Sequence, residues 1–438
     1  MREKLSLGTK VGFGVGDLGG NLFFTLISFW TLHYLTDVTG LAAASAGAAL
    51  MVGKLWDAVT DPLVGLISDR TKSRWGRRRP YLIFGSLPLA LAVVVFFWSP
   101  GFDNQTLLFW WVLLTFSVLN TAYSCVNIPY TSLSPELTAD YHERTSLNGY
   151  RFAFASVGTL LGAAIVGPIL SLFPQERTGF VAVGILFGFL IASTALLTGV
   201  SVRERPAAAQ SLPESLLKSW TGVWKNRPFR IVLGAYTLHL LGVTFLSGML
   251  VYFFKYALHD EAGTTLALLF LLAVAMVSIP LSVVFSRRFG KVATYQLALA
   301  VLAVGSLLVA FLGVPLGKPF VLAIMACSGV GLGFAYVPPF AMSADTIEVE
   351  ARASGRREEG AYYGLWNFAI KFAQAGGVAG SGLVLGWAGY IANQNQSPLA
   401  LGAIQTLIGP VPAVFFAAGL LLLFRYPLDE KTYRKLVG

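Results

Sequence analysis

Charged residues and cysteines are both scarce in this sequence. Of its 438 residues, 12% are charged and 55% are hydrophobic, and the mean hydropathy is +0.67. A soluble globular domain carries about 25% charged residues, so this composition excludes an ordinary soluble protein and indicates one embedded in a lipid bilayer. The two cysteines, Cys125 and Cys327, lie in apolar runs, so we expect neither a disulfide nor a metal site at either.

The sequence also lacks the signals of an enzyme or a nucleic-acid-binding protein. It has no nucleophile–base pair, no cluster of metal ligands and no catalytic domain outside the apolar segments, so we expect no enzyme activity and no cofactor. The glycines at 12–20 are spaced like a dinucleotide-binding fingerprint, but they follow no strand and open an apolar run. The formal net charge of +10 does not indicate nucleic-acid binding, because the basic residues are spread between apolar segments.

Apolar segments, by contrast, are abundant. About twelve are long enough to cross a bilayer, so the sequence predicts an all-α membrane protein with twelve transmembrane helices. The apolar segment after the basic N-terminus is too long and too polar for a signal peptide, so we expect it to be retained as the first span. The predicted spans lie at about 11–37, 41–69, 80–99, 106–134, 145–173, 179–201, 229–257, 263–286, 291–313, 318–342, 360–390 and 398–426.

The distribution of lysine and arginine predicts the orientation. Most of these residues fall at the two termini and in the loops after even-numbered spans, which places both termini in the cytoplasm by the positive-inside rule. The exceptions are Lys54, Arg151 and Lys371 within spans and Arg177, Lys255 and Lys318 in outward loops. We expect a multi-pass protein of a cell membrane, the inner membrane of a bacterium.

The longest polar stretch divides the chain into two halves. Residues 202–228 read as a cytoplasmic linker between an N-terminal six-helix bundle at 1–201, which holds the cation site, and a C-terminal bundle at 229–438. Basic turns follow the second span at 67–80 and the eighth span at 285–291. Corresponding turns in two six-helix halves are typical of the major facilitator fold, which has two pseudo-symmetric bundles.

The first basic turn resembles the signature that major facilitator proteins carry between their second and third helices. The resemblance implies that Asp69, Arg70, Arg77 and Arg78 latch the cytoplasmic side in one state and so act as gating residues. The alternative is plain positive charge on a cytoplasmic loop. Because Asp69 lies among basic residues, we favour the latch.

Two carboxylates lie inside the second span. Asp57 and Asp61 are four residues apart, so on a helix they share one face, roughly 6 Å apart along the axis. Charges at this depth normally face a protein interior or a wet cavity, and two like charges need a shared proton, cation or basic side chain. Pro62 follows directly and loosens the helix beside them. The pattern indicates cation coupling; the alternative is a buried ion pair with Lys54 that only orients the helix.

Other polar side chains recur at helical spacing within the spans. They are Asp17 and Asn21 in the first span, Asn120, Tyr123, Ser124, Asn127, Tyr130 and Thr131 in the fourth, Arg151 in the fifth, and Tyr363, Trp366, Asn367, Lys371 and Gln374 in the eleventh. The carboxylates lie in the first half and Lys371 in the second, so a salt bridge between moving halves would suit a switch. The charges within spans also sum to zero, which is compatible with structural pairing.

Small residues recur four apart in several spans. The pairs Gly158 and Gly162, and Gly376 and Gly380, predict that helices approach one another closely there. We assign packing, and no ligand, to these glycines.

Several sequence blocks together carry a family resemblance. They are GDLGGN (16–21), YLTDVTGL (34–41), KLWDAVTDPLVG (54–65), SRWGRRRP (73–80), NIPYTSL (127–133), RTSLNGYRF (144–152) and EGAYYGLWNFAIK (359–371). These blocks resemble the glycoside–pentoside–hexuronide:cation symporter family, the melibiose permease group of the major facilitator superfamily. The resemblance covers both halves in order and implies a secondary active symporter that couples H+ or Na+ movement to the uptake of a sugar or glycoside by alternating access.

The resemblance also implies roles for individual residues. The residues expected to bind the coupling cation, H+ or Na+, are Asp57, Asp61, Ser124 and Asn367, to which we add Asn127. Those expected to bind the sugar, between the halves near the bilayer midplane, are Asn21, Asn127, Thr131, Arg151 and Lys371. From the polar spacing within the spans we add Asp17, Tyr123 and Trp366 as candidate substrate-binding residues.

Some of these positions depart from the melibiose-type members. Those proteins have aspartate at the positions of Asn21 and Asn127 and tryptophan at that of Thr131. Fewer acids beside Arg151 and Lys371 predict a more positive cavity, which suits an anionic ligand such as a hexuronide. Asparagine at these positions also resembles the glucuronide and xyloside branches. We favour coupling to protons, because a proton needs one acceptor whereas sodium needs several oxygens.

Another branch of the superfamily supplies the alternative function. The vertebrate sodium-dependent lysophosphatidylcholine symporter has a similar second helix and a lysine that matches Lys371, so a cation-coupled lysophospholipid transporter on the same fold stays open. Under either function we expect a small-molecule substrate, contact with membrane lipids, no nucleic acid and a monomer.

Overall fold

The computed structural model describes residues 5–138, 141–204, 223–354, 359–428 and 432. Their regular structure is helical, and no strand occurs among these residues. The chain divides into two compact units, Met1–Gln210 and Ser211–Gly438. Most of the predicted linker, at 205–222, lies outside the described residues.

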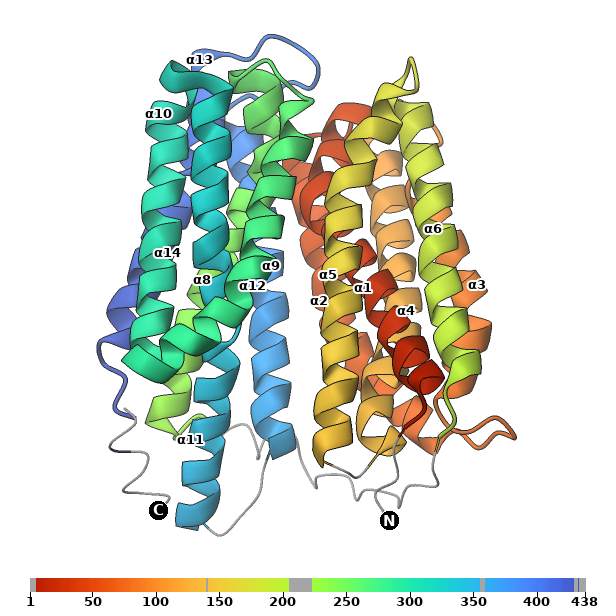
Figure 1. The fold of residues 1–438 in the computed structure, drawn as a ribbon. Helices are drawn as coiled ribbons and strands as arrows, with labels where there is room; N and C mark the ends of the chain where they lie inside the picture. Colours follow the sequence, from red (N-terminus) through yellow and green to blue (C-terminus); the bar gives the residue numbers. More distant parts are fainter. Residues whose placement is uncertain (1–4, 139–140, 205–222, 355–358, 429–431, 433–438) are drawn as a thin grey trace. The chain divides into compact units, whose positions relative to one another are not determined.

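The N-terminal unit is built from long helices that run alongside one another (Figure 1). They are α1 (Leu7–His33) with the π-helical turn η1 (Tyr34–Val38), α2 (Ala43–Arg70), α3 (Arg79–Phe96), α4 (Gln105–Leu137), α5 (Tyr141–Ser171) and α6 (Glu176–Ser201). Helix α1 packs against α5 and α6, α2 packs against α4, and α3 lies between α4 and α6. The polar residues predicted on the first, second, fourth and fifth spans therefore lie on packed neighbours.

The C-terminal unit repeats this pattern of a long first helix followed by a π-helical turn. Its elements are α8 (Arg227–Tyr252), η2 (Phe253–Ala257), α9 (Gly263–Phe289), α10 (Lys291–Phe334), α11 (Pro338–Ser354), α12 (Glu359–Trp387), α13 (Pro398–Ile408) and α14 (Pro410–Leu423). Helix α8 packs against α12 and α14, and α10 packs against α9 and α14. Short π-helical segments are often found at functional sites.

The prediction of twelve membrane-crossing helices stays a prediction. Ten helical segments among the described residues are long and apolar enough to cross a membrane. Helix α2, which carries Lys54, Asp57, Asp61, Asp69 and Arg70, is not among the ten. One of the ten, Lys291–Arg352, runs through Gly317, whose φ of +73° breaks the helical geometry inside α10.

Close packing at the glycines of α5 is confirmed. A Cβ at Gly158 would lie 2.3 Å from the carbonyl oxygen of Leu18, and one at Gly162 would lie 2.9 Å from the Cβ of Thr25. Both contacts are made to α1. Glycine is therefore required at Gly158, because the atom that a Cβ would meet there belongs to the backbone.

In the C-terminal unit the prediction is right for one glycine and wrong for the other. A Cβ at Gly380 would lie 2.8 Å from the ring of Phe245, but one at Gly376 would be in ordinary contact at 3.5 Å from its nearest neighbour. The tight position is Gly377, where a Cβ would lie 2.7 Å from Thr244. A spacing of four identifies a helix face, but it does not identify which of two adjacent glycines meets the neighbouring helix.

Substitution of two glycines in α5 tests this packing. Gly158→Ala should lower the free energy of unfolding by about 1–3 kcal/mol, because its Cβ would overlap the backbone of α1. Gly149→Ala is the matched control, since nothing lies within 4 Å of its Cβ position and alanine favours a helix by about 0.5–1 kcal/mol. Thermal unfolding in detergent measures both. Equal stabilisation by the two substitutions would contradict the close approach of α1 and α5.

Candidate functional site: an acid pair and an arginine in the N-terminal unit

Two carboxylates of α2 face one hydroxyl of α4. The Oγ of Ser124 lies 2.9 Å from Asp57 Oδ1 and 2.6 Å from Asp61 Oδ1. Asp57 is buried, with 7% of its surface exposed, and Asp61 is half-buried. The structure therefore brings together three of the residues predicted to bind the coupling cation.

One hydroxyl is shared between the two carboxylates. A serine hydroxyl has one hydrogen, so it donates to only one of the two carboxylates at a time. Two carboxylates that share one site at low dielectric repel each other unless a proton, a metal ion or a basic group lies between them. A geometry of this kind can accommodate a small cation. Lys54, the basic residue nearest in sequence, is half-buried on the same helix.

Packing between α2 and α4 fixes the position of the acid pair. Gly53 faces the ring of Phe116, and a Cβ at Gly53 would lie 2.3 Å from that ring. Trp56 Nε1 donates a hydrogen bond to Thr121 Oγ1 at 3.0 Å, which sets the rotation of one helix against the other. Because Thr121 and Ser124 are three residues apart, they lie on one face of α4, and both point to α2.

A second ionic group joins α1 to α5. Arg151 Nε donates to Asp17 Oδ2 at 2.5 Å, and Arg151 Nη2 donates to Asp17 Oδ1 at 3.3 Å. The guanidinium also lies over the rings of Phe13 and Tyr130, at 5.5 and 5.4 Å from their centroids. Two residues predicted to bind substrate separately, Asp17 and Arg151, thus form an ion pair, and the two rings were not predicted.

Asn21 continues this group one turn along α1. Its Nδ2 donates to the carbonyl oxygen of Asp17 at 2.8 Å, and its Oδ1 accepts from Thr159 Oγ1 at 3.3 Å. Thr159 lies two turns after Arg151 on α5. The α1–α5 seam therefore carries a continuous polar stripe, and the sequence signal for Thr159 was its helical spacing from Arg151.

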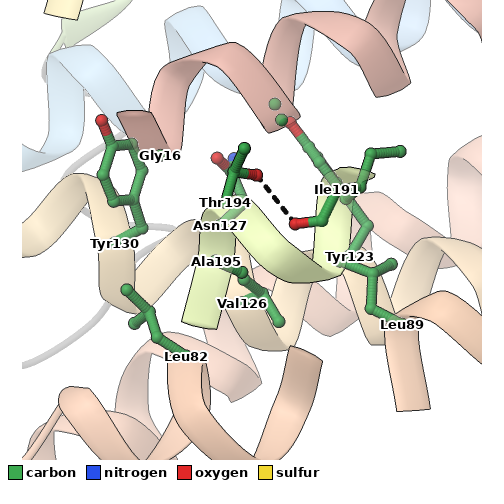
Figure 2. A pocket seen from close by; sticks show the side chains of 12 residues that line it. Gly16, Leu82, Leu89, Tyr123, Val126, Asn127, Tyr130, Ile191, Thr194 and Ala195 are labelled. Atoms are coloured by element: carbon green, nitrogen blue, oxygen red, sulfur yellow. Dashed lines mark hydrogen bonds between the residues drawn. The ribbon is translucent and has the colours of Figure 1, made fainter. Parts of the chain in front are cut away.

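The pocket in Figure 2 lies inside the N-terminal unit, between α1, α3, α4 and α6. Its unfilled space, counted together with the solvent at its open side, is about 310 Å³. Two predicted substrate-binding residues, Tyr123 and Asn127, line it together with Tyr130, and the Tyr123 ring stacks on Phe23 at 4.0 Å. Most of its other side chains are aliphatic, such as Leu82, so the pocket alone does not match the polar surface of a sugar.

The remaining predicted binding residues are Thr131, Asn367 and Lys371. Thr131 is exposed and donates to the carbonyl oxygen of Ile128 within its own helix. On α12, Asn367 is exposed and Lys371 is half-buried. Their roles stay predictions from the sequence.

Trp366 packs in the core of the C-terminal unit. Its side chain is 1% exposed and stacks on Tyr236 with ring centroids 4.7 Å apart, next to Phe340 at 5.5 Å. This environment favours packing over the predicted contact with substrate. Trp366 directly precedes Asn367 in the sequence, which gave no information on which residues cover the ring.

The predicted gating residues form an ionic network at the α2–α3 turn. Arg78 donates to Asp69 Oδ1 at 2.8 Å and to Glu136 Oε1 at 2.7 Å, and Arg77 donates to the same oxygen of Glu136 at 2.7 Å. The Glu136 side chain is 7% exposed. Arg70 ends α2 and is exposed. Three of the four predicted residues thus meet around an acid of α4 that was not predicted.

A second unpredicted acid, Glu204, closes the same turn. Its carboxylate accepts the backbone N–H groups of Arg77, Arg78 and Arg79 at 2.6, 2.8 and 2.7 Å. These donors lead into the N-terminus of α3, where a negative charge is favourable. Gly76 has a φ of +105°, and a Cβ there would lie 2.6 Å from the Glu204 carboxylate. In the sequence Glu204 lies between Arg203 and Arg205, whereas nothing in the sequence links Glu136 to this turn.

These features define a class of protein. Long apolar helices, ionisable groups buried between them and a charged turn between α2 and α3 are the features of an integral membrane protein that crosses the bilayer several times. The family model described as MFS/sugar transport protein matches residues 12–430, so the chain belongs to this family.

Relatives with sugar-transporter names support the predicted family resemblance, which is confirmed. The glucuronide carrier protein homolog of Escherichia coli (strain K12) is 32% identical over 444 residues, covering 100% of this chain and 96% of that protein. The isoprimeverose transporter of Lactiplantibacillus pentosus is 30% identical over 426 residues, covering 96% and 88%. The predictions of a transporter rather than an enzyme agree with both names.

A solved structure supports the fold. The crystal structure of the nucleoside transporter NupG (D323A mutant) matches with a TM-score of 0.68 and 17% identity, covering 96% of this chain and 99% of that chain. At this identity the likeness concerns the fold alone.

The ionic network at the α2–α3 turn should contribute to stability. Glu136→Gln keeps the shape of the side chain but removes the charge that two arginines share, so it should lower the free energy of unfolding by about 1–3 kcal/mol. Glu348→Gln is the control, because its partner Arg352 is 51% exposed and surface pairs contribute less than about 1 kcal/mol. Thermal unfolding of both variants measures the difference, and an equal effect would show that the network adds nothing.

Proposed function

We propose that this protein is a secondary active symporter that couples the inward movement of H+ or Na+ to the uptake of a sugar or glycoside. The observation that carries the proposal is the hydroxyl of Ser124 within hydrogen-bonding distance of both Asp57 and Asp61. A buried and a half-buried carboxylate that share one donor favour the binding of a cation. Binding of that cation would reduce the buried charge before the protein changes conformation.

Protons are the coupling ion that we favour. The acid pair and Ser124 offer a compact set of oxygens from two helices. A single proton bound by Asp61 could be shared with Ser124 Oγ, which lies 2.6 Å from Asp61 Oδ1. Sodium would need more oxygen ligands around the same point. Asn127 and Asn367 stay predicted contributors to the cation site, on α4 and α12.

The proposed substrate is a sugar or glycoside, including an anionic one such as a hexuronide. Its proposed ligands in the N-terminal unit are Asn21, Asn127, Arg151 and, nearby, Tyr123, and Lys371 is the ligand predicted in the C-terminal unit. The positive charge that first suggested an anionic ligand is partly balanced, because Asp17 is paired with Arg151. The relatives named for a glucuronide and for isoprimeverose leave both an acidic and a neutral sugar to be tested.

The remaining proposals concern the membrane, the orientation of the termini and the oligomeric state. We propose that the protein resides in a bacterial inner membrane with both termini in the cytoplasm and acts as a monomer. The lysophospholipid alternative is not favoured by relatives whose names refer to sugars.

Uptake into proteoliposomes tests the coupling. A labelled neutral glycoside, a labelled glucuronide and lysophosphatidylcholine are offered under an imposed proton or sodium gradient. The unmodified protein should accumulate a sugar under one gradient, and Asp57→Asn and Asp61→Asn should lower that accumulation at least tenfold. Asp103→Asn is the control, since Asp103 is exposed in the α3–α4 loop. Accumulation by the Asn variants would refute the assigned cation site, and uptake of only the lysolipid would replace the proposed substrate.

Substitutions at Ser124 test the contribution of its hydroxyl to cation binding separately from that of the two acids. Ser124→Ala removes the group that bridges both carboxylates and should raise the cation concentration needed for half-maximal uptake about tenfold, in line with the loss of a hydrogen bond to a charged group. Ser124→Thr keeps a hydroxyl and should change this concentration much less. A titration of uptake rate against the coupling ion measures both, and identical curves for Ala and Thr would count against a role for the hydroxyl.

A further inference from the structure

Arg151 is held in place by more than its ion pair. Its guanidinium lies over the rings of Phe13 and Tyr130, whose centroids are 5.0 Å apart. The Tyr130 hydroxyl donates to the carbonyl oxygen of Phe13 at 2.9 Å, which fixes one ring relative to the other. Rings of this kind attract a cation by their faces. The position of Arg151 therefore does not depend on the charge of Asp17 alone.

The ion pair is partly accessible. The side chains of Arg151 and Asp17 are 24% and 17% exposed. A guanidinium carries five N–H donors, and the two bonds to Asp17 use only Nε and Nη2. An oxygen of a ligand could thus approach Arg151 beside Asp17 or in its place.

Asp17 determines the local charge of this group. Among the residues that the structure describes, it is the only acid bonded to Arg151. Its neighbours in the polar stripe, Asn21 and Thr159, are neutral. With Asp17 ionised, the group has no net charge, and without that charge it carries the full positive charge of Arg151.

We infer that Asp17 is a specificity-determining residue, which acts as the internal counter-ion of Arg151 and sets how strongly the site binds an acidic sugar relative to a neutral one. The inference rests on the proposed function, because it takes Arg151 to be a sugar ligand. An acidic sugar must compete with the Asp17 carboxylate for the guanidinium, and the two negative charges repel each other. A neutral sugar meets neither effect, since its hydroxyl groups can accept from Arg151 while Asp17 remains bound.

Two ligands that differ in a single group test the inference. They are p-nitrophenyl β-D-glucoside, with a hydroxymethyl group at C5, and p-nitrophenyl β-D-glucuronide, with a carboxylate there. Binding of each to the purified full-length protein is measured by calorimetry near neutral pH. Asp17→Asn keeps the shape and an oxygen that accepts from Arg151, so it should raise the affinity for the glucuronide relative to the glucoside at least tenfold. The control, Asp103→Asn, removes an exposed charge from a loop and should leave this ratio unchanged.

A double-mutant cycle separates this effect from a change in folding. In an Arg151→Gln background, Asp17→Asn should no longer change the ratio of affinities, because the counter-ion has nothing left to neutralise. If the ratio is unchanged by Asp17→Asn in the unmodified background, or shifts towards the glucoside, the inference is wrong although the transporter assignment stands. If the effect persists in the Arg151→Gln background, Asp17 acts through another group and the inference is also wrong. If the unmodified protein binds neither ligand, the proposed sugar site itself fails.

Discussion

A pair of carboxylates one turn apart in α2 is the constraint on which the other features of the N-terminal unit depend. Asp57 and Asp61 face α4, which lies close enough for Ser124 to reach both. Gly53 permits that approach, and the bond from Trp56 to Thr121 fixes its rotation. A buried charge costs from about 3 kcal/mol upwards in a membrane, so this packing must be maintained with good geometry whenever no cation is bound.

The N-terminal unit contains two ionic groups of different character. The acid pair places two carboxylates around one hydroxyl, a geometry that can accommodate a cation. The Asp17–Arg151 pair joins one acid to one base and is held by two rings. The proposed ion and the proposed sugar are therefore assigned to different groups of one bundle.

Much of this arrangement could be predicted from the sequence, and the exceptions have physical causes. Spacing placed Asp57 and Asp61 on one helix face, and the resemblance to known symporters supplied Ser124. Neither could predict that Asp17 pairs with Arg151, because that contact depends on how α1 packs against α5. Trp366 was assigned to substrate by its spacing, yet its neighbours in the fold cover it. The division between the predicted spans at 291–313 and 318–342 coincides with Gly317, whose φ of +73° interrupts α10.

At the α2–α3 turn, too, the sequence predicted residues but not the contacts between them. Its basic residues and Asp69 were evident in the sequence. The acids that organise them are Glu136, at the end of α4, and Glu204, three residues after α6. Contacts between residues so far apart in the chain follow from the packing of the helices. A predicted latch could therefore be located, whereas its partners could be identified only in the folded unit.

The most direct test of the central claim is to measure whether a gradient of sugar moves the coupling cation across the membrane. Proteoliposomes are given an inward sugar gradient and no ion gradient, and the internal pH and the uptake of labelled sodium are followed together. Because coupling is reciprocal, the account predicts that sugar entry carries protons or sodium inward. Sugar that enters while neither ion moves would contradict the assignment of a symporter.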